Sequence, residues 1–380
     1  MMGAPTYQAA RLVAGTVEQH FLQHQERARL LGEQNLAPVP PARLIEAIID
    51  AAFWASLRRE EGHPPKISLA FLPPDFAVKP MLFQKRIPLA PYMLTKLAPG
   101  VERPGIHLGV WHEQEVLYVW GTTHAVNSFC FVLDVSEPGL LVIKHRRIGS
   151  YGKFTNVAVL KGDQIKIVDE QSASLPDCPE LLTTLLGFTS VYAPNDAVNV
   201  LVQLAVSMRA HGRGGTLLVV PANSEAWRGS ILHPISYAVS PAFSGLSDQM
   251  HQSMEQRNLG LWQGALRREI DNLAGLTALD GAVIINNQYE LLAFGAKITR
   301  AGGSVVVEQM VVTEPIEGNV AEIVNPSLHG GTRHLSAAQF VYDQHDAIAL
   351  VASQDGRFTI FAWSPCEEMV HAHRIDTLLL

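Results

Sequence analysis

The sequence is poor in cysteine, and it has no long apolar run. Its three cysteines, Cys130, Cys178 and Cys366, lie far apart and form no CxxC or other paired spacing. This scarcity argues against a disulfide framework and against a cysteine-based zinc site, and an odd number of isolated thiols favours a reducing, cytoplasmic setting. No stretch approaches the roughly 18 apolar residues of a membrane-spanning helix. The first twenty residues also lack the basic and then apolar pattern of a signal peptide. We therefore expect a cytoplasmic protein that does not interact with membranes.

Charge is also scarce, and positive charge in particular. Charged residues make up 17% of the chain, and the 29 Lys and Arg are outnumbered by 36 Asp and Glu, which gives a formal net charge of −7. Non-specific binding to nucleic acid needs clustered basic residues, so we expect no nucleic-acid partner. A local basic pocket for one small anion remains compatible with this balance. Apolar residues reach 47%, enough for a packed core.

Residues 1–175 have the pattern of an α+β domain with an antiparallel sheet. Helical spacing of apolar residues predicts helices over 8–34 and 42–62, and a short apolar strand follows at 66–74. Between 105 and 170, six short strands alternate with turn residues, which is typical of an antiparallel sheet. The polar, proline-containing segment 173–180 predicts a join between domains.

Residues 185–380 mix helices and strands, which predicts an α/β domain with a mixed sheet and flanking helices. The expected helices cover 196–212, one or two segments within 247–274, and a segment that begins near 332. The expected strands are 214–221, 280–287, 290–298, 304–312, 346–353 and 358–363.

The tripeptide DGA at the start of the strand 280–287 is the first candidate site. An Asp-Gly turn into a strand is common, and on that interpretation Asp280 has no further role. The alternative is that Asp280 presents a carboxylate at the edge of a sheet, while Gly281 and Ala282 leave room beside it. Carboxylate oxygens suit Mg²⁺ or Mn²⁺, which also hold phosphate oxygens. Asp280 is therefore a candidate metal ligand.

The second candidate is GGTRH, which leads into the helix near 332. In the simpler interpretation Thr332 caps the helix and Arg333 is a solvated charge. In the other, the first free N–H groups of the helix form an anion site that Gly331 leaves open. Thr332 would then add a hydroxyl, Arg333 a guanidinium that grips phosphate, and His334 a further hydrogen bond.

The two motifs together resemble the diadenylate cyclase (DAC) domain, which joins two ATP molecules into cyclic di-AMP. The resemblance covers roughly residues 190–365 and rests on DGA at 280–282, GTRH at 331–334 and an Asp-Ala pair at 346–347. It implies that Asp280 sits at the metal and the attacking hydroxyl of ribose. It also implies that Thr332, Arg333 and His334 contact ATP.

The sequence departs from the DAC pattern in the helix after GTRH. Leu335 stands where the family has a second arginine, and residues 340–343 read FVYD where the family has Gly-x-Ser-Glu. Tyr342 thus replaces a small phosphate donor, while Asp343 keeps a carboxylate with a shorter reach and stays a predicted nucleotide contact. A nucleotide seat survives such changes more easily than cyclisation chemistry. A diverged DAC core behind an unrelated N-terminal half is similar to the DAC-like sensor families of the type called DACNV.

Three functions follow from this resemblance. The first is a sensor that binds ATP or an adenine (cyclic di)nucleotide, with Mg²⁺ or Mn²⁺ accompanying the nucleotide. The alternative is an active diadenylate cyclase that uses Asp280 and a divalent metal, and whose DAC-like domains pair in a homo-oligomer so that two ATP molecules meet. The third is an interaction module with a vestigial pocket.

Overall fold

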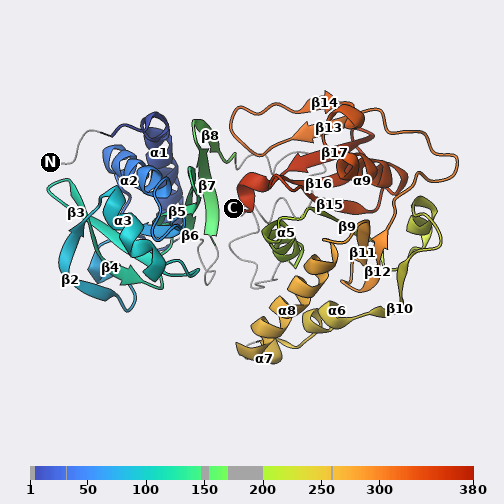
Figure 1. Cartoon of the computed structure of the whole chain (residues 1–380), viewed down its shortest axis with the longest axis horizontal. Helices are drawn as coiled ribbons and strands as arrows, with labels where there is room; N and C mark the ends of the chain where they lie inside the picture. The colour runs from blue at the N-terminus through green and yellow to red at the C-terminus, as the bar shows by residue number, and fades with distance from the viewer. Residues whose placement is uncertain (1–4, 31, 147–153, 170–199, 258–259) are drawn as a thin grey trace. The chain divides into compact units, whose positions relative to one another are not determined.

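The chain forms two compact units. The computed structural model describes residues 5–30, 32–146, 154–169, 200–257 and 260–380 (Figure 1). The described residues up to Val168 form the N-terminal unit, and Asp169 together with the described part of 200–379 forms the C-terminal unit. The join predicted at 173–180, the boundary predicted between 175 and 185, Cys178 and the first residues of the helix predicted at 196–212 lie outside the described residues.

The N-terminal unit is built on an eight-stranded sheet with the order β2-β4-β3-β1-β5-β6-β7-β8. The strands are β1 (Ile67–Phe71), β2 (Met81–Pro88), β3 (His107–Glu113), β4 (Val116–Thr123), β5 (Phe131–Glu137), β6 (Leu140–Arg146), β7 (Phe154–Lys161) and β8 (Gln164–Ile167). All neighbours pair antiparallel apart from β1 and β3, which run parallel. The predicted antiparallel sheet therefore needs one correction, because the chain forms β2 and a helix before it returns beside β1.

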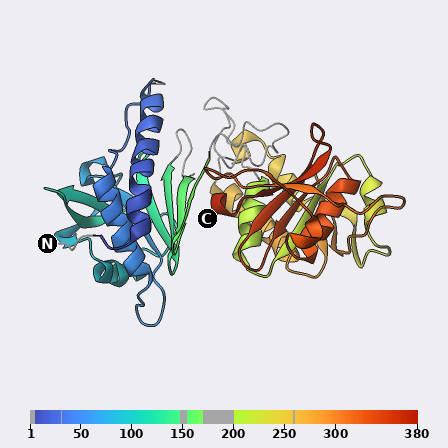
Figure 2. The same ribbon diagram turned by 90° about the horizontal axis from the view of Figure 1, so that it is seen from above.

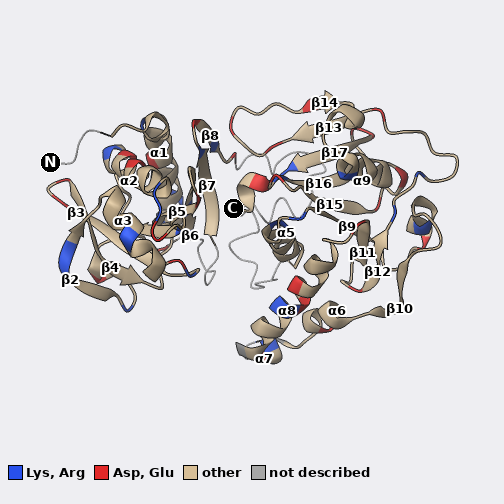
Figure 3. Cartoon of the chain, viewed as in Figure 1, with Lys and Arg blue, Asp and Glu red and all other residues tan. Residues whose placement is uncertain are grey.

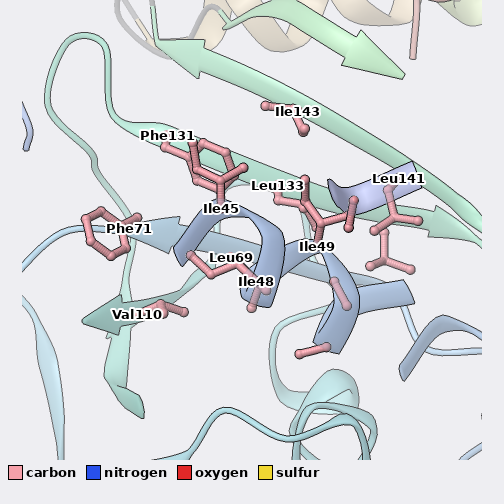
Figure 4. Packing of buried hydrophobic residues seen from close by; sticks show 14 of the residues in the cluster. Ile45, Ile48, Ile49, Leu69, Phe71, Val110, Phe131, Leu133, Leu141 and Ile143 are labelled. Atoms are coloured by element: carbon pink, nitrogen blue, oxygen red, sulfur yellow. The ribbon is translucent and has the colours of Figure 1, made fainter. Parts of the chain in front are cut away.

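Helices cover one face of this sheet and bury the core of the unit. They are α1 (Gln8–Leu30), α2 (Ala42–Ser56) and α3 (Pro91–Leu97), with 3₁₀ turns η1 (Pro74–Phe76) and η2 (Ala98–Gly100). Figure 2 shows α1 and α2 side by side next to the sheet. The isoleucines of α2 recur at helical spacing and pack against strand residues such as Leu69, Phe131 and Leu133, as Figure 4 shows. The helix ends at Ser56, before the predicted end at Gly62.

The C-terminal unit is built on a nine-stranded mixed sheet with the order β10-β12-β11-β9-β15-β16-β17-β13-β14. The strands are β9 (Gly215–Val220), β10 (Tyr237–Phe243), β11 (Ala282–Asn286), β12 (Leu291–Ala296), β13 (Met310–Thr313), β14 (Glu322–Val324), β15 (Ile348–Ala352), β16 (Phe358–Ser364) and β17 (Met369–Arg374). Strands β9 and β11 pair parallel and are buried at every position. A strand that is buried throughout needs cover on both faces of the sheet.

Helices supply this cover. They are α5 (Val200–Ala210), α6 (Gly245–Met250), α7 (Met254–Arg257), α8 (Gly260–Leu276) and α9 (Thr332–Asp343), with 3₁₀ turns η4 (Ala226–Ser230), η5 (Pro326–Leu328) and η6 (Asp376–Leu378). Helix α9 packs Ala337, Ala338, Phe340 and Val341 against the sheet. Helices α5 and α8 contact each other, and they contact β15 and β12 respectively. The predicted α/β class, with a mixed sheet and flanking helices, is confirmed.

Several predicted elements differ from the structure. Of the strand predicted over 304–312, only residues 310–312 belong to a strand, β13, and residues 247–274 hold parts of three helices. The sequence pattern does not predict strands β2, β10, β14 and β17. The pattern misses β2 and β10 because both are exposed edge strands, which lack the alternation of apolar and polar residues. Strand β17 is buried, but its histidines interrupt the apolar pattern by which a strand is predicted.

Charge and cysteine distribution fit the composition. Figure 3 shows basic and acidic residues interspersed over both units, with a short basic stretch on β2. Cys130 is buried and Cys366 is exposed. Within the described ranges, none of the helices combines the length and the apolar character needed to cross a membrane.

Candidate functional site

The two sequence motifs meet at one edge of the C-terminal sheet. Ala282 of β11 is level with Thr216 of β9, and Gly215 of β9 is level with Ala352 of β15. Neighbouring strands lie about 4.8 Å apart, so Asp280 just before β11 lies at the same edge as the start of β9 and the end of β15. The start of α9 reaches this edge too, because a Cβ atom placed on Gly214 would lie 3.0 Å from Nη1 of Arg333.

A hollow of about 430 Å³ opens at this edge. Its lining consists of Asp280, Gly331, Thr332, Arg333, His334, Val351, Ala352 and Ser353. The hollow thus brings together five of the eight residues that the sequence singled out. Its volume falls within the range of about 300–1,000 Å³ that is typical of small-molecule sites.

Asp280 presents an exposed carboxylate that is already paired. Its side chain is 89% exposed, and Oδ2 forms an ion pair with the ammonium of Lys297, the residue that follows β12. The hydrogen bond and charge of Lys297 hold the pKa of Asp280 below its usual value, and the charge of Arg333 adds to this effect. Asp280 therefore stays ionised and lies within the field of two cations.

Arg333 is half-buried at the second position of α9. Within the part of the chain that the structure describes, its guanidinium has no hydrogen bond and no salt bridge. A guanidinium carries five N–H donors and keeps its charge, so a half-buried one without a partner is suited to an anion from solution.

Helix α9 begins without a side-chain cap. Gly331 is the N-cap residue and Thr332 is the first helical residue, so the simpler interpretation of Thr332 as the cap is wrong. The N–H groups of His334 and Leu335 both bond to the carbonyl of Gly331. The exposed hydroxyl of Thr332 is left at the surface of the hollow.

His334 faces the hollow but also packs inward. Its Nε2 lies 3.4 Å from Oγ1 of Thr359, and its ring meets Phe361 edge-on at 5.9 Å between centroids. Burial lowers the pKa of His334, against the opposing charge of Asp355. The imidazole is therefore neutral at neutral pH and can donate one hydrogen bond.

Gly281 and Ala282 do not line the hollow. Gly281 has a φ of +108°, and a Cβ atom there would lie 2.5 Å from the carbonyl carbon of Gly295. Ala282 is buried in the core cluster that includes α9. Their small size serves the close packing of β11 against β12, which differs from the ligand approach that the sequence pattern suggests.

Asp343 lies at the other end of α9, away from the hollow. Its carboxylate accepts hydrogen bonds from the N–H of Ala301 at 2.8 Å, from Ser304 Oγ, and from Gln339 Nε2 at 2.9 Å. Eleven residues of helix separate it from Thr332, which corresponds to about 16 Å. The structure therefore does not bring the predicted nucleotide contact at Asp343 to the other site residues.

The side chains that the structure describes do not form a metal site by themselves. Among the described residues, no group of three or more His, Cys, Asp or Glu is arranged to hold a metal ion. Asp280 is the one carboxylate among the described residues that line the hollow, and the ammonium of Lys297 is bonded to one of its oxygens. The donor set thus does not fit a resident Mg²⁺ or Mn²⁺.

Lys297 is the charged residue of this site, among those described, that the sequence pattern did not single out. The strands 280–287 and 290–298 form a hairpin in which Ala282 is level with Ala296. This antiparallel register brings Lys297, the residue after β12, close to Asp280, which lies two residues before β11. Pairing the two predicted strands in sequence would have placed Lys297 beside Asp280.

Comparison with known proteins adds a family match in the N-terminal unit. Residues 34–124 match the family model of a probable sensor domain, DACNV. The match covers about a quarter of the chain and runs from α2 through β4. The match thus falls in the region for which the sequence suggested no role.

Other comparisons contribute little. No curated protein is significantly similar to the chain. Among solved structures, the crystal structure of the hypothetical membrane spanning protein from Bacillus cereus is 14% identical, covers 50% of this chain and 68% of that chain, and has a TM-score of 0.28. No functional inference is drawn from a likeness at this level.

Proposed function

We propose that the C-terminal unit is a diverged DAC-like domain that binds ATP or an adenine (cyclic di)nucleotide in the hollow beside Asp280 and Arg333. The chain as a whole would act as a nucleotide sensor in the cytoplasm. The probable sensor domain at residues 34–124 supports the sensing role. The resemblance of the DGA and GTRH motifs supports the choice of an adenine nucleotide.

The observation that carries the proposal is that the guanidinium of Arg333 lacks a bonding partner among the described residues. Its half-buried guanidinium borders a hollow of about 430 Å³ and has no hydrogen bond or salt bridge to the described residues. Partly desolvating a charge costs free energy unless a partner compensates for it. A phosphate group would supply that partner in bidentate geometry.

Isothermal titration calorimetry of the full chain with ATP and with cyclic di-AMP tests the proposal. Arg333→Met should weaken binding about 10- to 100-fold, since a hydrogen bond to a charged group contributes about 1.5–3 kcal/mol. Arg300→Met is the matched control, because Arg300 is exposed and lies outside the lining of the hollow. Absence of heat with both nucleotides, or equal affinity in Arg333→Met, would contradict the proposal and favour an interaction module.

The alternative is an active diadenylate cyclase. It is supported by the position of Asp280 and Arg333 on one hollow. Leu335 and the Lys297 contact of Asp280 weigh against it. Incubation with ATP and Mn²⁺, followed by chromatography, would reveal cyclic di-AMP if the chain is a cyclase, and Asp280→Asn would abolish the product. Such an enzyme would also have to pair its DAC-like domains in a homo-oligomer.

A further inference from the structure

Lys297 is held at the candidate site by its backbone as well as by its ammonium. The carbonyl of Lys297 accepts a hydrogen bond from the N–H of Leu232 at 2.8 Å, and the N–H of Thr299 bonds to the carbonyl of Ser230 at 2.9 Å. Ile298 forms a bridge with Ile231 between these two bonds. The ammonium therefore projects from a fixed segment toward Asp280.

The charges at the hollow favour an anion without the help of a metal. Of the lining residues that the structure describes, Asp280 is the one acidic residue, and Lys297 neutralises its charge. Arg333 then leaves an excess of positive charge. Proteins usually hold Mg²⁺ through one or two carboxylates together with phosphates. Here the carboxylate of Asp280 is already in contact with the ammonium of Lys297, so its electrostatic attraction for a divalent ion is reduced.

We propose that this hollow binds the phosphates of its nucleotide without a divalent metal, and that Lys297 and Arg333 supply the positive charge. Asp280 forms an ion pair with Lys297 and does not hold a metal. This inference rests on the proposed function, and it departs from the Mg²⁺ or Mn²⁺ that the resemblance implies.

Titration of the full chain with ATP in excess EDTA and in excess Mg²⁺ tests the inference. The affinities should agree within about twofold, because the cations of the protein are present in both conditions. Binding that needs Mg²⁺ would overturn the inference and leave the proposed function intact. Absence of binding in both conditions would overturn the proposed function itself.

Two substitutions give opposite results under the two modes of binding. In EDTA, Lys297→Met should weaken ATP binding about tenfold, while Asp280→Asn should bind as tightly as the parent or tighter, since a carboxylate repels phosphate. If a metal held by Asp280 were required, Asp280→Asn would abolish the binding that the parent shows in Mg²⁺, and Lys297→Met would not weaken that binding. Arg300→Met serves as the control, and thermal melting checks that each variant is folded.

Discussion

At the scale of single residues, Gly281 allows the tight turn between Asp280 of the candidate site and strand β11. Its φ is +108°, a backbone conformation that residues other than glycine rarely adopt, and its Cα lies close to the backbone of Gly295. The turn that presents Asp280 at the edge of the sheet therefore depends on the absence of a side chain at the next position.

Gly281→Ala should destabilise the C-terminal unit by about 1–3 kcal/mol, because strained backbone and a close contact act together. Gly275→Ala is the matched control. Gly275 is exposed on α8, and a Cβ atom added there would have nothing within 4 Å, so alanine should leave stability unchanged or raise it. Denaturant unfolding measures both, and equal stability of the two variants would contradict this account.

At the scale of elements, α9 serves two separate purposes. Its first residues line the hollow, while Gln339 and Asp343 near its end hold the segment 301–307. Gln339 accepts from the N–H of Val307 at 2.9 Å and donates to the carbonyl of Val305 at 3.0 Å. Irregular backbone thus gains the hydrogen bonds that a strand would have supplied.

Asp343→Ala should loosen the segment 301–307 and lower stability by about 1–2 kcal/mol, since it removes the acceptor of three hydrogen bonds. Nucleotide affinity should not change. Hydrogen exchange of the segment and calorimetry measure the two effects, with Asp346→Ala as an exposed control. A large loss of affinity in Asp343→Ala would restore Asp343 as a nucleotide contact.

At the scale of the whole molecule, each unit buries a histidine that stays neutral. Burial lowers the pKa of His107 in the N-terminal unit to about 4, where the charges of Lys144 and His124 add to the effect and Asp134 opposes it. Burial likewise lowers the pKa of His373 in the C-terminal unit to about 4, together with the charge of His371. Nδ1 of His373 lies at hydrogen-bond distance, 2.8 Å, from Oγ1 of Thr313.

Both units should therefore lose stability as the pH falls from about 6.5 to about 4, since the unfolded chain binds a proton there that the folded chain does not. Each histidine contributes a loss of roughly 2 kcal/mol by pH 5. Hydrogen exchange near neutral pH and near pH 5 measures each unit separately. His373→Asn should reduce the pH dependence of the C-terminal unit alone, and an equal dependence with and without His373 would contradict the prediction.

Local pattern was sufficient for most of the buried elements, although it missed the buried strand β17, whose histidines interrupt the apolar run. The strands between residues 105 and 170 and the strands β9, β11, β15 and β16 follow runs of β-branched and apolar residues, and α2 follows helical spacing. Edge strands such as β2 and β10 escaped prediction because half or more of their side chains face solvent.

The sequence by itself determined the class of fold and the presence of two charged motifs about fifty residues apart. Only the tertiary structure decided which residues share the hollow. It placed the start of α9 beside Asp280, and it turned Asp343 away toward residues 301–304. The packing and direction of α9 depend on contacts between segments far apart in the sequence, and no local pattern encodes them.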